Sequence, residues 1–193
     1  MAKNVVLAGV LGGLTIFAWA CVAFLVLPLG EVGIREMPNE PAFLNAVRNN
    51  VVVPGLYFFP GEGLATGAPP AQEKAAAEAW QKKLHNEPVG MLVYRGLGVG
   101  GTTSKQIMTQ FITNLAQGLL AAFLLARAKL KRYSARVGFM LVLALLASIN
   151  TNVAYWNWYG FPTTYTLAYV FTLFCGYSLA GLVAAAIVKE YPA

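Results

Sequence analysis

The chain has 193 residues, of which 58% are hydrophobic and only 11% charged, and its mean hydropathy is +0.58. Soluble domains carry roughly a quarter charged residues, so this composition excludes an ordinary soluble protein and favours a membrane protein. The net charge of +6 could suggest nucleic-acid binding, but five basic residues and no acid lie in the single segment 127–136. Basic residues concentrated in one short segment between apolar runs indicate the orientation of a membrane protein. We therefore predict no nucleic-acid partner.

Four apolar runs predict four transmembrane helices. The first covers residues 1–30, because Val5 to Leu29 carries no charge and a spanning helix needs about 20 apolar residues. This run is longer than the apolar core of a signal peptide, which spans roughly 7–15 residues, so we predict an uncleaved helix. The other three helices are predicted at 106–127, 137–155 and 163–189. A basic loop at 128–136 and an aromatic turn at 156–162 connect them, and residues 190–193 form a tail.

Residues 31–105 differ in composition and predict a small α/β subdomain inserted after the first helix. Asn39 can cap a short helix, and the Ala-, Glu- and Lys-rich stretch Ala71 to Leu84 predicts a second. The β-branched and aromatic runs Val51–Pro60 and Val89–Tyr94 predict two strands. A sheet of two strands is only marginally stable in water, so this subdomain is expected to pack against the membrane helices or against a partner. The predicted fold class is a mainly α membrane protein with four spans and this insertion.

The basic loop 128–136 sets the expected orientation. Short loops rich in Lys and Arg stay in the cytoplasm, which puts both termini inside as well. Residues 31–105, with seven basic and seven acidic residues, and the aromatic turn then lie on the outer side. In a bacterium this means an inner-membrane protein with a periplasmic subdomain.

The turn 156–162 lies between two apolar runs and holds two of the four tryptophans. Trp and Tyr collect where a membrane meets water, and Gly160 and Pro162 disfavour a continuous helix. Because the turn and the subdomain are expected on one side, we predict that Trp156, Trp158 or Phe161 packs against the apolar strands as well as marking the lipid boundary.

Small residues recur every four positions in three of the predicted spans, where they allow helices to approach closely. Such ridges serve packing within the bundle or an interface with another chain, and both alternatives stay open. The candidate packing residues are Gly9, Gly13, Gly118, Ala122, Gly176 and Ala180.

Between their ends the spans contain amides but no Asp, Glu, Lys, Arg or His, which argues against a proton pump. Four amides form one stripe on the second span, and two lie near the outer end of the third. They serve either interhelical hydrogen bonds or a polar pocket that opens outward. The residues are Gln106, Gln110, Asn114, Gln117, Asn150 and Asn152.

Catalytic and metal sites find no support in the sequence. His85 is the sole histidine, and Cys21 and Cys175 both lie inside apolar runs. A zinc or di-iron centre needs several ligands at set spacing, and a serine triad would have to use His85. We therefore predict no catalytic residue, no cofactor and no metal.

Three segments carry a resemblance to known proteins: Gly9 to Trp19 with Leu27-Pro28, Pro54 to Pro60, and Tyr155 to Pro162. Together they resemble a family of small, uncharacterised bacterial four-helix inner-membrane proteins, and the resemblance implies no activity. Three functions follow as hypotheses. The first is a non-enzymatic accessory or structural subunit of a larger membrane complex. The second is binding or transport of a small neutral or lipidic ligand in the polar pocket. The third and weakest is an enzyme that uses His85.

Overall fold

The computed structural model describes residues 2–63, 69–101 and 103–188. The predicted tail 190–193 lies outside these residues. The chain forms two compact units, one of residues 1–35 and 102–193 and one of residues 36–101. Each unit is described by itself below.

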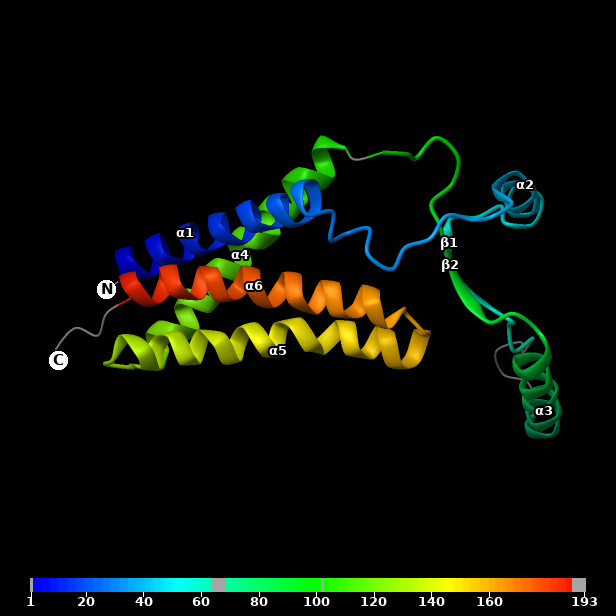
Figure 1. Cartoon of the computed structure of the whole chain (residues 1–193). Coiled ribbons are helices and arrows are strands. Elements are labelled where there is room, and N and C mark those ends of the chain that lie inside the picture. Colours follow the sequence, from blue (N-terminus) through cyan, green and yellow to red (C-terminus); the bar gives the residue numbers. More distant parts are fainter. Residues whose placement is uncertain (1, 64–68, 102, 189–193) are drawn as a thin grey trace. The chain divides into compact units, whose positions relative to one another are not determined.

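The first unit is built of four long helices (Figure 1). They are α1 (Ala2–Cys21), α4 (Ser104–Arg127), α5 (Tyr133–Tyr159) and α6 (Thr163–Ile187). A π-helical turn, η1 (Val22–Val26), extends α1. All four are long and apolar enough to cross a membrane. The prediction of a mainly helical protein with four membrane-length helices is confirmed.

Local signals decide where these helices begin and end. Thr103 caps α4 through a capping box, in which its hydroxyl accepts from the Gln106 backbone N–H and the Gln106 side chain accepts from the Thr103 N–H. Gly160 ends α5 with φ at +69°, a conformation that suits glycine. Helix α5 thus runs past the predicted limit of 155, and the turn shrinks to residues 160–162. Trp156 and Trp158 lie on the helix, because nothing before Gly160 breaks it.

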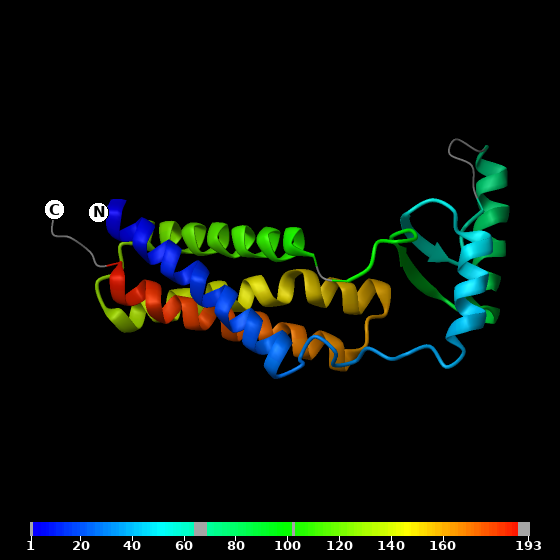
Figure 2. The same cartoon turned by 90° about the horizontal axis from the view of Figure 1, so that it is seen from above.

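Helix α1 lies between two neighbours (Figures 1 and 2). It packs against α4 on one side and against α6 on the other, and α5 packs against α6. Helices α4 and α5 meet at the turn 128–132 and make few contacts beyond it. The order of neighbours is therefore α4, α1, α6, α5, with an opening between α4 and α5.

The α1–α4 crossing depends on glycine. A Cβ added at Gly118 would collide with the Gly13 nitrogen and the Gly9 oxygen, and one added at Gly13 would lie 2.6 Å from the Leu115 Cα. Ala122 is fully buried in the same cluster as Ala8. In a lipid bilayer the hydrophobic effect does not favour association of helices, and close backbone contact of this kind stabilises the helix pair instead.

The α1–α6 contact combines a small residue with a hydrogen bond. The Trp19 ring lies over Gly176, where a Cβ would come within 2.9 Å of its Cδ1. The indole Nε1 donates to the Thr172 carbonyl at 2.8 Å. Ala180, on the same side of α6, lies near Gly12.

Replacing Trp19 with phenylalanine is expected to lower the free energy of unfolding by about 1 kcal/mol, because the ring stays and one interhelical hydrogen bond is lost. Thermal unfolding in mild detergent measures the change. Trp158→Phe is the matched control, since the Trp158 ring is 77% exposed. Equal effects of the two substitutions would contradict the prediction.

The second unit holds two helices and two strands in the order α2 (Glu40–Asn50), β1 (Gly55–Phe59), α3 (Pro70–Asn86) and β2 (Gly90–Tyr94). Asn39 caps α2 as predicted, with its side-chain oxygen accepting from the Ala42 N–H. The strands pair antiparallel with Gly55 opposite Tyr94 and Phe59 opposite Gly90, which confirms the small two-stranded sheet. Strand β1 is shorter than predicted and begins only after Pro54.

Candidate functional site

The predicted amide stripe on α4 divides into separate groups. Gln106 belongs to the capping box at the start of the helix. Gln110 Nε2 donates to Asn114 Oδ1 at 2.8 Å, and Asn114 is only 2% exposed on the side of α4 that faces α1. Only Gln117 turns toward the opening between α4 and α5.

A groove of about 430 Å³ occupies this opening. Gln117 lines it from α4, Asn150 from α5 and Tyr177 from α6, and the remaining lining is apolar. The apolar residues are Leu120, Ala121, Leu124, Met140, Leu143, Leu146 and Ala147. A mostly apolar cleft with a few polar groups is typical of sites for small molecules, which measure about 300–1,000 Å³.

The three polar side chains of the groove make no hydrogen bond within the described chain, either with one another or with other residues. Asn152, by contrast, turns back to its own helix and donates to the Ser148 carbonyl at 2.8 Å. The structure therefore brings Gln117 and Asn150 into one groove and leaves Gln106, Gln110, Asn114 and Asn152 outside it. Sequence spacing could not separate these groups, because the pairing of helices decides which side of α4 is covered.

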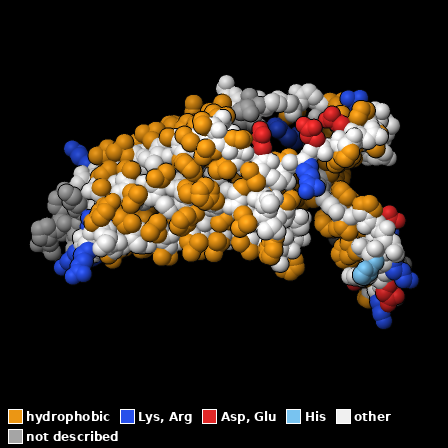
Figure 3. All heavy atoms as spheres, viewed as in Figure 1, with side chains coloured by type: hydrophobic (Ala, Val, Ile, Leu, Met, Phe, Trp, Pro, Cys, Tyr) orange, Lys and Arg blue, Asp and Glu red, His pale blue; other side chains and the backbone are white. Residues whose placement is uncertain are grey.

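The end of the helical unit that carries the turn 128–132, called the basic end below, is rich in Lys and Arg (Figure 3). Arg127, Lys129, Lys131 and Arg132 are exposed there. Arg136 was predicted in the loop but lies in the first turns of α5 and is only 7% exposed. Its Nε donates to the Ala185 carbonyl at 2.9 Å, and its Nη1 to the Leu130 and Lys131 carbonyls. Arg136 thus fastens α5 to α6 and to the turn.

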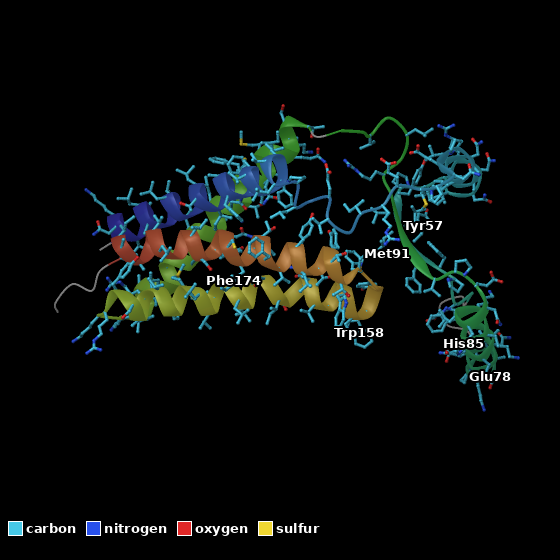
Figure 4. The ribbon with its side chains drawn as sticks, in the orientation of Figure 1. Tyr57, Glu78, His85, Met91, Trp158 and Phe174 are labelled. Atoms are coloured by element: carbon cyan, nitrogen blue, oxygen red, sulfur yellow. The ribbon has the colours of Figure 1, made fainter. Side chains whose placement is uncertain are left out.

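The opposite end carries a series of aromatic rings from η1, α5 and α6. The ring of Phe161 contacts Tyr155 and Tyr165, with centroids 5.2 and 5.4 Å apart, and Tyr165 stacks on Tyr169. Trp156 donates to the Thr163 hydroxyl, whereas Trp158 is directed away from the helices (Figure 4). Contact between these side chains and residues 36–101 stays a prediction.

The described part of residues 36–101 contains no buried residue. One face of the sheet carries Leu56 and Phe58 from β1 and Met91 and Val93 from β2, which lie opposite one another in the register. Leu56 is 65% exposed and Val93 is 64% exposed. We call these four residues the apolar sheet face. Apolar surface of this kind on a folded unit is a sign of an interaction site.

Chemistry-bearing residues are scattered. His85 lies in the last turn of α3, on the side of the helix that also carries Glu78 (Figure 4). Among the described residues, no three His, Cys, Asp or Glu side chains gather where they could hold a metal ion. Comparison with protein-family models, with curated proteins and with solved structures finds no match to this chain.

Proposed function

We propose that this is a multi-pass protein of a bacterial inner membrane with residues 31–105 outside and both termini in the cytoplasm. The support is the basic end, where four exposed cations lie beside the ends of α4 and α5. A fusion reporter placed in the turn 128–132 and another placed after Gly100 test this orientation. Labelling of both from the same side of the membrane would overturn it.

We propose further that the protein is a non-enzymatic accessory subunit of a larger membrane assembly, to which residues 36–101 bind another membrane protein. The single observation that carries this is the apolar sheet face, in a unit whose described residues include no buried side chain. A folded unit has to cover such residues, because each large apolar side chain gains about 1.5–3 kcal/mol on burial. Covering them against a partner is the role of a subunit.

Replacing Val93 with lysine is expected to remove the partner that co-purifies with the wild-type protein in mild detergent. A charge placed in the middle of an apolar interface has to lose its water without a counter-charge. Val99→Lys is the matched control, because Val99 is also exposed but lies in the connector after β2. A wild-type protein that runs as a lone monomer of 20.7 kDa would overturn the subunit proposal.

A second function, binding of a small neutral or lipidic ligand, is favoured by the groove. Gln117 and Asn150 lie on its two opposite walls and have no hydrogen-bond partner among the described residues, so a ligand that carries a carbonyl or hydroxyl group can bond to either. Gln117→Leu is expected to lower the affinity for a neutral lipid without unfolding the protein. The substitution removes one hydrogen bond to the ligand and keeps the size of the side chain. Mass spectrometry of co-purified lipids measures this.

A further inference from the structure

The inner half of the groove, which Leu120, Leu124, Met140 and Leu143 line, leads directly to the basic end. Leu124 lines the groove three residues before Arg127, and Met140 lines it four residues after Arg136. Both walls therefore run into the turn 128–132, which joins them. The exposed cations of that turn therefore follow directly on the end of the groove that Leu124 and Met140 line.

The length of this inner half matches one leaflet of a bilayer. Ten residues separate Gln117 from Arg127 on α4, and at 1.5 Å per residue they span about 15 Å. The hydrocarbon core of a bilayer is about 30 Å thick, so about 15 Å is one leaflet. The lining over this distance is apolar, and its large side chains are Leu120, Leu124, Met140 and Leu143.

Among the residues that the structure describes, the charged side chains of the basic end are all cationic. No Asp or Glu occurs between Pro88 and Lys189. Arg136 uses its donors on the Ala185, Leu130 and Lys131 carbonyls, whereas Arg127, Lys129, Lys131 and Arg132 are exposed. Basic pockets beside transmembrane helices are suited to anionic lipid headgroups.

We propose that this inner half binds one anionic phospholipid. Its phosphate lies against Lys131 and Arg132 at the basic end, and one acyl chain follows Leu124 and Leu143 toward Gln117. A groove of about 430 Å³ with a mostly apolar lining suits a slender acyl chain. The inference deepens the lipidic-ligand function proposed above and is independent of the subunit role.

The test uses the full chain, delipidated in mild detergent and titrated with phosphatidylglycerol or with phosphatidylcholine of the same acyl chains. Native mass spectrometry counts the lipids bound. We expect one tightly held phosphatidylglycerol, and binding at least about tenfold weaker for phosphatidylcholine. The double variant Lys131→Gln with Arg132→Gln is expected to abolish the preference. Lys82→Gln with Lys83→Gln, which removes equal charge from α3, is expected to leave it unchanged.

A second pair of variants tests the groove itself. Ala147→Phe places a ring in the groove and is expected to prevent retention of the lipid, with Ala121→Phe as a second filling variant from the other wall. Ala116→Phe is the control, because Ala116 is exposed on α4 outside the groove. An unchanged melting temperature shows that a filled variant is folded.

Each other outcome overturns the inference. Equal affinity for the two lipids overturns the anionic site and leaves the lipidic-ligand function standing. Retention of no lipid by the wild type overturns both. If the charge variant loses phosphatidylglycerol but the two filled variants retain it, the exposed cations attract the headgroup and the groove holds no acyl chain. If the filled variants retain the lipid but lose a co-purifying protein, the groove binds a partner protein instead.

Discussion

Gly118→Ala is expected to destabilise the helical unit by about 1–3 kcal/mol or more, the cost of overpacking a close contact. The added methyl group would collide with the Gly13 nitrogen and the Gly9 oxygen, which are backbone atoms and cannot turn aside. Helix α1 would have to move away from α4 along the crossing. Unfolding in mixed micelles, followed by circular dichroism, measures the loss.

Gly138→Ala is the matched control for this effect. Gly138 lies on α5, and a Cβ added there meets nothing within 4 Å. Alanine is a better helix former than glycine by about 1 kcal/mol, so this substitution is expected to be neutral or stabilising. Two glycine-to-alanine changes in the long apolar helices should thus have different effects, since only Gly118→Ala is expected to destabilise. Destabilisation of similar size in both would contradict the packing described at the α1–α4 crossing.

Arg136→Ala is expected to destabilise the protein by at least about 2 kcal/mol, because hydrogen bonds to a charged group are worth about 1.5–3 kcal/mol. The guanidinium bonds to carbonyls on α6 and in the turn at the same time, with Nη1 to Lys131 O at 2.7 Å. Its loss frees the start of α5 from the end of α6. Proteolysis at the turn 128–132 and thermal unfolding in detergent measure the change.

Two further substitutions separate the charge of Arg136 from its geometry. Arg132→Ala removes an exposed charge four residues earlier and is expected to change stability by less than about 0.5 kcal/mol. Arg136→Lys keeps the charge but offers a single nitrogen, so it is expected to recover only part of the stability. Full recovery by lysine would show that charge alone, and not the bonded carbonyls, holds the turn.

The sequence by itself determined the class of the protein and its elements. Four charge-free runs of about 20 residues or more predict four spanning helices, because a bilayer core leaves the backbone no other partner than itself. Local signals were also sufficient at Asn39 and Gly160, since a cap or a left-handed turn depends on neighbouring residues alone.

The boundaries of α5 show where composition was insufficient. Charge and aromatic content suggested a loop up to 136 and a turn from 156, but helix-forming residues continue the hydrogen bonding from Tyr133 to Tyr159. Arg136 lies inside the helix because its guanidinium finds carbonyls on α6 and in the turn. A charge can be buried only where distant residues supply such partners, and sequence order does not reveal them.

Only the tertiary structure decided how the amide side chains are distributed. In the sequence, Gln110, Asn114 and Gln117 belong to one stripe, but α1 covers Asn114 and leaves Gln117 at the groove. That division follows from which helices touch, and helix pairing depends on the fit of Gly9, Gly13 and Gly118 across two segments about a hundred residues apart in the chain. Hydropathy and periodicity are properties of one segment, whereas a groove and its polar lining are properties of three.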